Sequence, residues 1–230
     1  FINDTFNTGD WRLKRHAESE FWKWLASWAA CISKPSDIGF PDEGYELPPL
    51  NLQTITVEVD QSESAGDDLF RIATLSATTM HREMRMTSAA RSDEVAKLVS
   101  ESEEPWIVWC NTNDEADALT SRIEDAIEVR GSDTPEKKQR LLADFSEGRA
   151  RVIITKPSIA GFGLNWQHCR NVAFVGLSYS FEDFYQAPRR SYRFGQTKQV
   201  NAYVIQAQTE GAISKVIHTK IKQHEEMQRN

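Results

Sequence analysis

Two arginines in the last quarter of the chain carry the clearest chemistry in this sequence. Arg190 and Arg193 stand three residues apart, behind Gln186, in the run QAPRRSYRFGQ at residues 186–196. On a helix this spacing puts both guanidinium groups on one face. No acidic residue between 184 and 209 is available to neutralise them. Such a pair suits a cluster of anionic oxygens, for example a phosphoryl group during transfer.

The segment upstream separates this pattern from an ordinary solvated basic face. The apolar run at residues 152–154 is typical of a buried parallel strand, and it leads into TKPSIAGFGLNWQ at 155–167. A strand that enters a glycine-containing loop exposes backbone N–H groups to a phosphate. The glycines alone are weak evidence. A second apolar strand at 171–177 and then the arginine helix follow in order, and this order favours phosphate chemistry.

These motifs resemble those of a known enzyme class. GFGLN at 161–165 resembles motif V of superfamily two helicases and translocases, and QAPRRSYRFGQ resembles their motif VI. The closing Phe194-Gly195-Gln196 is similar to the Swi/Snf branch, in particular to the Swi/Snf-like helicases of phages and prophages. Tyr192 departs from that pattern, which has His there. The resemblance extends over most of the chain, and its specific motifs lie between residues 105 and 206.

The alternation of short apolar strands with helices predicts an α/β fold with a parallel sheet covered on both faces. The resemblance implies that this is a RecA-like lobe, preceded by a helical and extended connector. Helix 67–101 is expected in two pieces, with Asp67 as a cap and with Arg85, Arg91 and Lys97 on a polar face. The expected strands are 54–59, 106–110, 126–129, 152–154, 171–177 and 200–206, and the other helices are one from 113, 135–147, motif VI and 211–228.

The chain is expected to have three parts. Residues 1–65 hold an aromatic-rich helix, 11–33, and a proline-rich connector in which Leu47-Pro48 matches the interlobe junction of the resembling family. Residues 66–208 form the RecA-like lobe, and residues 209–230 a C-terminal helix. The aromatic helix could stack on bases, but packing against a core or another domain is favoured. The start at Phe1 rather than Met suggests a piece of a longer protein.

The resemblance also implies a composite ATP site. In that family ATP lies between two RecA-like lobes, and motif VI arginines of the second lobe approach the γ-phosphate. Arg190 and Arg193 would be these arginine fingers, and Gln186 would organise the lobe interface or the nucleotide contact. The nucleotide-binding positions implied by motif V are Gly161, Gly163 and Asn165.

The same comparison implies contacts to the phosphate backbone of DNA or RNA. Thr155 and Lys156 from motif V are the strongest candidates. The positions of motif IV and its companion are Asn111, Thr112, Gly131 and Ser132, for which an ordinary strand-to-helix turn is an equal explanation. Residues 148–209 hold eight basic and two acidic residues in a chain of net charge −7. This asymmetry favours a phosphate-facing surface on an acidic body.

Two strings that suggest a complete DEAD-box enzyme are rejected. DEAD at 114–117 and SAT at 76–78 stand in the wrong order, and no Gly-x-x-x-x-Gly-Lys-Ser/Thr loop exists to hold ATP and Mg²⁺. The acids at 114–117 are better explained as first-turn partners of a helix dipole. The chain alone is therefore expected to bind no cofactor and to be inactive. ATP and Mg²⁺ belong to a full-length enzyme that includes the N-terminal lobe.

Composition places the chain in a reducing compartment. Three cysteines without paired spacing and no secretory or membrane-spanning run predict the cytoplasm, and the scattered histidines predict no metal site. The resemblance to phage and prophage helicases implies a bacterial or phage-infected cell. Two alternatives remain open. One is a non-catalytic interaction module on the same fold, docking a partner through helix 11–33. The other is a self-contained nucleotide-binding α/β enzyme.

Overall fold

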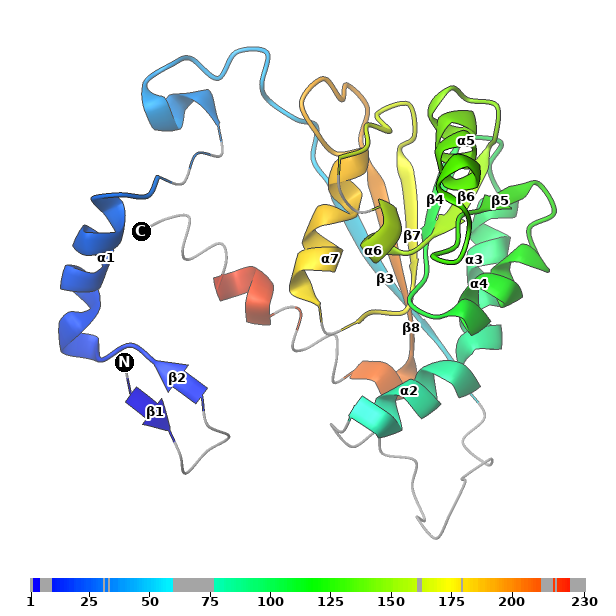
Figure 1. The fold of residues 1–230 in the computed structure, drawn as a ribbon, viewed down its shortest axis with the longest axis horizontal. Coiled ribbons are helices and arrows are strands. Elements are labelled where there is room, and N and C mark those ends of the chain that lie inside the picture. The colour runs from blue at the N-terminus through cyan, green and yellow to red at the C-terminus, as the bar shows by residue number, and fades with distance from the viewer. Residues whose placement is uncertain are drawn as a thin grey trace, which may run out of the picture. The chain divides into compact units, whose positions relative to one another are not determined.

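The computed structural model describes residues 2–4, 10–30, 32, 34–59, 77–160, 163–178, 180–211, 217 and 219–223. The chain divides into two compact units, each visible in Figure 1. Residues Phe1–Tyr45 with Lys222–Asn230 form the first unit, and Glu46–Ile221 form the second. The second unit holds every residue that the motifs single out.

The first unit is small and rich in exposed aromatic side chains. Strands β1 (Ile2–Asp4) and β2 (Asp10–Arg12) form an antiparallel pair. Helix α1 (Glu18–Ala26) lies within the expected aromatic helix and buries none of its residues, and a 3-10 helix η2 (Pro35–Ile38) follows. Trp24 and Trp28 are 57% and 64% exposed, with ring centroids 5.3 Å apart in an edge-on arrangement.

The second unit is built on a six-stranded sheet in which every strand pair is parallel, as predicted. Its order is β3-β8-β7-β4-β6-β5. The strands are β3 (Asn51–Val57), β4 (Trp106–Trp109), β5 (Ala126–Glu128), β6 (Val152–Thr155), β7 (Asn171–Val175) and β8 (Asn201–Ala207). Strands β4, β6 and β7 are buried along their whole length, which explains their continuous apolar sequences.

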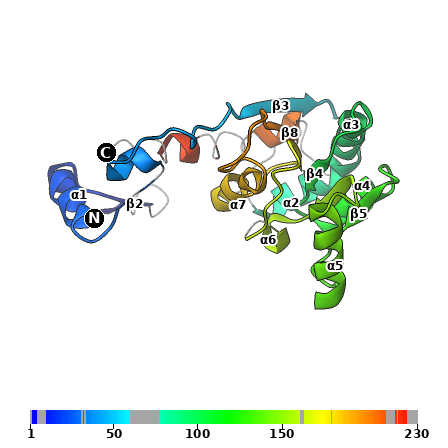
Figure 2. The ribbon, with the colours of Figure 1, turned by 90° about the horizontal axis from the view of Figure 1, so that it is seen from above.

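Helices cover both faces of this sheet, which Figure 2 shows from above. On one face α3 and α4 pack with residues such as Val95, Val99 and Leu119. On the other, α5, α6 and α7 contribute Phe145, Ala160 and Phe184. The helices of the unit are α2 (Ala77–Met86), α3 (Ser88–Ser100), α4 (Asn113–Thr120), α5 (Pro135–Ser146), α6 (Pro157–Ala160) and α7 (Phe181–Gln186), with 3-10 helices η3 (Pro188–Arg190) and η4 (Gln208–Glu210).

The structure changes one local prediction that matters for the site. Arg190 and Arg193 do not share an α-helix, because α7 ends at Gln186 and a 3-10 turn follows. Pro188 begins that turn; since proline has no backbone N–H, it cannot continue the α-helical hydrogen bonds. The turn closes with short-range bonds from Arg190 N to Ala187 O (3.3 Å) and from Ser191 N to Pro188 O (3.0 Å).

Other boundaries differ by a few residues. Strand β3 begins at Asn51 rather than at 54, and β7 ends at Val175 rather than at 177. The two helical pieces predicted for 67–101 are α2 and α3, while residues 67–76, including the Asp67 cap and the first residue of SAT, lie outside the described residues. In the predicted closing helix, residues 219–223 are helical, and 212–216, 218 and 224–228 lie outside the described residues.

Candidate functional site

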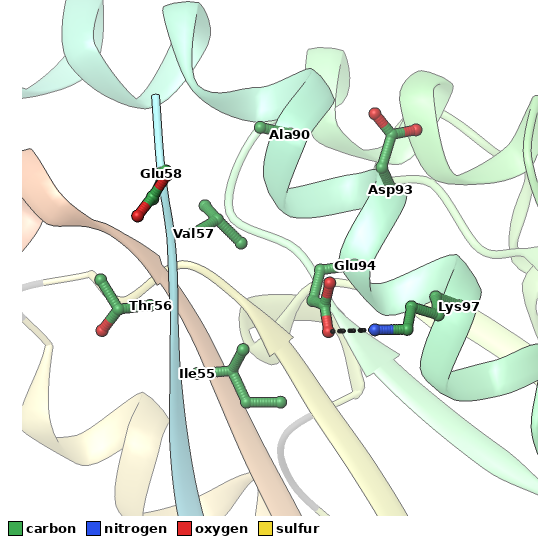
Figure 3. A pocket seen from close by; sticks show the side chains of 8 residues that line it. All are labelled: Ile55, Thr56, Val57, Glu58, Ala90, Asp93, Glu94 and Lys97. Carbon is green, nitrogen blue, oxygen red and sulfur yellow. Dashed lines mark ion pairs between the residues drawn. The ribbon is translucent and has the colours of Figure 1, made fainter. Parts of the chain in front are cut away.

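A hollow beside β3 contains none of the predicted site residues. It has a volume of about 570 Å³ and lies between β3 and α3 (Figure 3). Its lining includes the carboxylates of Glu58, Asp93 and Glu94 against the single cation Lys97, which pairs with Glu94 at 3.6 Å. This excess of negative charge disfavours an anionic ligand there, so the hollow does not fit a nucleotide.

The carboxyl ends of the parallel strands bring the predicted nucleic-acid residues to one edge of the sheet. Asn111 and Thr112 follow β4, Gly131 and Ser132 follow β5, and Lys156 follows β6. The Lys156 Nζ atom donates a hydrogen bond of 2.8 Å to Asn113 Oδ1 at the start of α4. Motif V and the motif IV position are therefore joined directly.

Thr155 is the predicted contact that fits least. Its side chain is buried, with 1% of the residue exposed, and its hydroxyl donates to the Val129 carbonyl at 3.2 Å. The hydroxyl therefore joins β6 to the end of β5 and does not face solvent. The expected backbone contact from Thr155 does not fit this geometry, and of the two motif V candidates only Lys156 has its polar group outside the core.

The backbone at Asn111 and Thr112 is already occupied by a carboxylate. Glu115 Oε2 accepts from the N–H groups of Asn111 (2.7 Å) and Thr112 (3.1 Å), and Thr112 Oγ1 accepts from Glu115 N (3.2 Å). This reciprocal arrangement is a capping box at the start of α4. It confirms that Glu115 and Asp114 serve the first helical turn. The backbone N–H groups of Asn111 and Thr112 are therefore not available to an outside ligand.

Each acid of the DEAD string is paired with an arginine. Asp114 lies 3.1 Å from Arg85, Glu115 lies 2.7 Å from Arg91, and Asp117 pairs closely with Arg130. Carboxylates that are neutralised in this way are poor ligands for Mg²⁺. The structure therefore agrees with the rejection of a DEAD-box reading at these residues.

Gly131 and Ser132 form an exposed turn between β5 and α5. Asp133 Oδ2 accepts from Arg130 N at 2.8 Å, and Lys138 Nζ donates to the Gly131 carbonyl at 2.6 Å. The Arg130 guanidinium pairs with Asp117 and Glu128, and this pairing raises its pKa. Its charge is therefore neutralised within the lobe. The Ser132 side chain is exposed.

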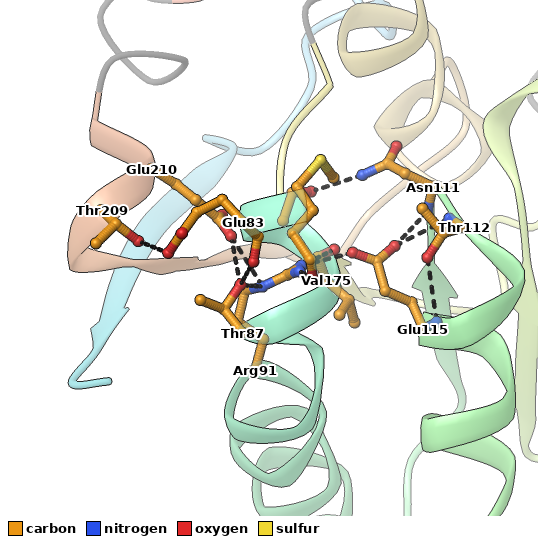
Figure 4. A network of polar contacts seen from close by, with 11 residues as sticks. Glu83, Thr87, Arg91, Asn111, Thr112, Glu115, Val175, Thr209 and Glu210 are labelled. Atoms are coloured by element: carbon orange, nitrogen blue, oxygen red, sulfur yellow. Dashed lines mark hydrogen bonds and ion pairs between the residues drawn. The ribbon is translucent and has the colours of Figure 1, made fainter. Parts of the chain in front are cut away.

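Arg91 was predicted on a polar helix face, but the structure buries it completely. Figure 4 shows its guanidinium between Glu115 and Glu210, and all three residues are at most 1% exposed. Arg91 Nη1 donates to Glu115 Oε1 and to the Val175 carbonyl, both at 2.7 Å. Arg91 Nε lies 3.1 Å from Glu210 Oε1. One cation thus joins α3, α4, the end of β7 and η4.

Gly176 makes room for this cation. Its φ of 83° is in the left-handed region, and a Cβ atom there would collide with the Arg91 guanidinium. The Gly176 carbonyl also accepts from Asn111 Nδ2 at 3.4 Å. In the sequence, the glycine directly after the apolar run of β7 was the one signal that another group approaches the backbone here. It did not indicate that this group is the Arg91 side chain.

Motif VI brings two guanidinium groups onto one backbone oxygen. Nη1 of Arg190 and Nη1 of Arg193 each donate to the Leu164 carbonyl at 3.3 Å. Arg190 is 8% exposed and Arg193 is exposed. Among the described residues neither side chain has a carboxylate partner. Burial lowers the pKa of Arg190, and the neighbouring charges of Arg193 and Arg189 lower it further.

The other predicted nucleotide residues lie near this pair. Gln186 accepts from Arg190 through its side-chain oxygen and through its backbone carbonyl, both at 3.5 Å. Gly163 is exposed with a φ of 76°, and Asn165 Oδ1 accepts from Gln167 N at 3.4 Å. Gly161 lies outside the described residues. Trp166 N donates to Arg190 O at 2.8 Å, so the motif V loop and motif VI form one assembly.

Known proteins share this part of the chain. Residues 90–195 match the family model described as helicase conserved C-terminal domain. They are similar to helicase C-terminal domains. The match includes Arg91, motif V and motif VI as far as Gly195, and ends before Gln196 and Glu210. A search of curated proteins finds no match.

Solved structures share the fold. The C-terminal part of the Fun30 ATPase domain is 24% identical with a TM-score of 0.51, covering 56% of this chain and 45% of its own. The C-terminal domain of the DEAD-box protein Dbp5 is 20% identical with a TM-score of 0.50, covering 58% and 79%. A DEAD box protein from the hyperthermophile Methanococcus jannaschii is 20% identical with a TM-score of 0.50, covering 57% and 37%. The chain thus spans less than half of the first and third structures.

Within the described residues, no helix is both long and apolar enough to cross a membrane.

Proposed function

We propose that this chain is the C-terminal ATPase lobe of a nucleic-acid-dependent ATPase, a helicase or duplex translocase of the Swi/Snf-like branch. Two findings support the proposal: the match of residues 90–195 to the helicase conserved C-terminal domain, and the RecA-like parallel sheet. The observation that carries it is the pair of guanidinium groups on Leu164 O. In this proposal Arg190 and Arg193 are arginine fingers for an ATP site that an N-terminal lobe completes.

The electrostatics of the pair suit this role. Two like charges that share one neutral carbonyl gain little from it, so an arriving phosphate would improve the interaction of both. Arginines that meet charge developing in the transition state act on turnover, and a finger of this kind contributes about 10³ to 10⁵ in rate. Gln186 would hold Arg190 in place, and Gly163 and Asn165 would border the nucleotide on the motif V side.

The metal belongs to the other lobe in this proposal. Mg²⁺ would supply neutralisation of the phosphate charge, and the residues that hold it would need free carboxylate or hydroxyl oxygens. The acids nearest in sequence to such a motif, Asp114, Glu115 and Asp117, are held by arginines and do not fit. The chain alone would therefore not hydrolyse ATP.

The nucleic-acid contacts would lie at the carboxyl edge of the sheet. Lys156 is held there by a neutral amide, and the side chains of Thr112 and Ser132 stand at the neighbouring strand ends. Contacts of this kind fix the backbone of DNA or RNA without reading its sequence. The proposal includes a phage-type or prophage-type enzyme in the cytoplasm of a bacterial cell.

The first test is Arg193→Ala in a full-length enzyme that carries both lobes. We expect nucleic-acid-stimulated ATP hydrolysis to fall by about 10³-fold or more, because transition-state charge loses its partner. The circular dichroism spectrum and unfolding midpoint should be unchanged, since Arg193 is exposed. Arg149→Ala is the control, because that exposed arginine already pairs with Asp144 and Glu147. Near-normal turnover in Arg193→Ala would remove the arginine-finger assignment.

The alternative of a non-catalytic interaction module has one observation in its favour, the exposed side chains of Trp24 in α1 and Trp28 just after it. Such a module would have no use for two arginines without carboxylate partners in the described structure. The same ATPase measurement separates the two functions.

A further inference from the structure

Two glutamine side chains join the motif V loop to the motif VI turn in both directions. We define the motif V loop as residues 163–167 and the motif VI turn as residues 190–196. Gln167 Nε2, from the loop, donates to the Phe194 carbonyl in the turn. Gln196 Nε2, from the turn, donates to the Gln167 carbonyl at 2.9 Å and to the Ser191 carbonyl at 3.2 Å. Together these side chains form what we call the amide clamp.

The amide clamp is a packed arrangement in which the polar atoms of Gln196 all have partners. Gln196 is 6% exposed, and its side-chain oxygen accepts from Lys198 N at 3.0 Å, so both ends of its amide are used. Gly195, with a φ of 92°, keeps the turn close to the loop, and a Cβ atom there would lie only 3.2 Å from Gln167 Nε2. Buried amide groups that are satisfied in this way define one geometry, since any shift leaves polar groups without partners.

The clamp closes around the segment that holds the arginine pair. Leu164, whose carbonyl binds both guanidinium groups, lies three residues before Gln167. Arg193 lies three residues before Gln196, whose N–H donates to the Arg193 carbonyl at 2.9 Å. The Trp166 N to Arg190 O bond lies between them. Loss of the amides would leave both arginines charged and present while loosening the frame that aims them.

We propose that Gln167 and Gln196 are positioning residues that set the arginine pair for the γ-phosphate. This inference rests on the proposed function and adds the means by which the fingers are aimed. Because the fingers act on the transition state, a small misplacement lowers kcat much more than it changes KM for ATP. Because both glutamines join the same loop to the same turn, we also expect their effects on kcat to be non-additive. Once one glutamine is replaced, replacing the other should lower kcat little further.

The test uses Gln167→Met, which keeps the length of the side chain and removes its N–H donor. In the full-length enzyme we expect kcat to fall by about 10- to 100-fold, with KM for ATP changed less than about threefold. Gln167→Lys restores a donor at the same place and should recover most of the lost kcat. Gln199→Ala is the matched control, because Gln199 is exposed and no hydrogen bond to its side chain is found in the described structure.

A second measurement uses the 230-residue chain without nucleotide. The hydrogen-exchange rate of the Trp166 and Gln196 backbone amides should rise about tenfold in Gln167→Met and stay unchanged in Gln199→Ala. Gln196→Met should act in the same direction, and the double variant should add little to either single change in kcat. If Gln196→Met unfolds, Gln167→Met at its half-exposed position still tests the inference.

The outcomes separate this inference from the proposed function. If Arg193→Ala abolishes turnover while Gln167→Met behaves as Gln199→Ala does, the clamp is only structural and the inference is wrong. If Arg193→Ala leaves turnover intact, the proposed function fails whatever the glutamines do. Equal losses in Gln167→Met and Gln167→Lys would also contradict the inference, because the donor would then be irrelevant.

Discussion

Two groups of arginines in this lobe are satisfied in opposite ways. Arg91 is fully buried and meets two carboxylates, from α4 and from η4. Arg190 and Arg193 meet only neutral oxygens in the described structure, the Leu164 carbonyl for both and Gln186 for Arg190, and Arg193 is exposed. Both groups hold together segments that are distant in the sequence. They differ in whether a carboxylate in the described structure pairs with them.

This difference distinguishes cations that pair within the fold from those that we propose meet an anion. A fully buried arginine without a carboxylate would be costly. Arg91 pairs with two carboxylates inside the lobe, so its charge is not available to a ligand. The motif VI arginines keep their capacity for an anion because only dipoles hold them. Lys156, bonded to the amide of Asn113, belongs with the second group. Arg130 and Arg149, each with two carboxylates, belong with the first.

The largest expected effect tests the structural member. Arg91→Met in the 230-residue chain would leave Glu115 and Glu210 buried without their cation. We expect the free energy of unfolding to fall by about 3 to 5 kcal/mol, measured by urea denaturation. Arg193→Ala should change it by less than about 0.5 kcal/mol, since the side chain is exposed. Similar losses in both variants would erase the distinction drawn here.

An intermediate effect is expected from Lys156→Ala in the full-length enzyme. If Lys156 contacts a phosphate, log Kd should depend less steeply on log salt concentration, with a slope reduced by about one. Affinity should fall alike for unrelated sequences. Arg149→Ala serves again as control, because its charge is already neutralised. An unchanged slope in Lys156→Ala would place the nucleic acid elsewhere.

The smallest effect concerns the second carboxylate of Arg91. Burial raises the pKa of Glu210, although Arg91 and Thr87 act against it. A carboxyl with a raised pKa contributes stability below its unfolded pKa, ordinarily 4.5, and loses that contribution as pH rises through the folded pKa. Glu210→Gln does not titrate there. Relative to the parent chain, its unfolding free energy should therefore improve from pH 4.5 to pH 8, by less than the Arg91 effect.

Equal pH dependence of urea denaturation in the parent chain and in Glu210→Gln would show that Glu210 keeps its charge across this range. Arg91 would then be paired with two full negative charges, and the contrast with motif VI would be sharper.

Much of the fold could be predicted because the buried strands are recognisable as apolar runs in the sequence. Residues 106–109, 152–154 and 172–175 are continuous apolar runs, and a parallel sheet covered on both faces requires them. Strand β3 was predicted too short because its first residues, Asn51-Leu52-Gln53, lie at the sheet edge and are largely exposed. Periodicity is weak where burial is weak.

The residue types of the candidate site can be read from the sequence, but the hydrogen-bond partners of these residues cannot. The spacing of Arg190 and Arg193 pointed to an anion, yet their common acceptor is a backbone carbonyl, which no residue type reveals. Helical periodicity placed Arg91 on a polar face, whereas its burial depends on Glu115 and Glu210 from other elements. Thr155 carries a hydroxyl that the motif favours, but its direction is set by the Val129 carbonyl.

The strand order has a consequence for synthesis of the lobe. Strand β8 lies between β3 and β7, so the first strand of the sheet finds its neighbour only when Asn201–Ala207 has been made. Until then β3 and β7 would both present open edges on the ribosome, and pairing across such a long stretch of chain is slow. We therefore expect nascent chains truncated before β8 to be prone to aggregation and to need a chaperone.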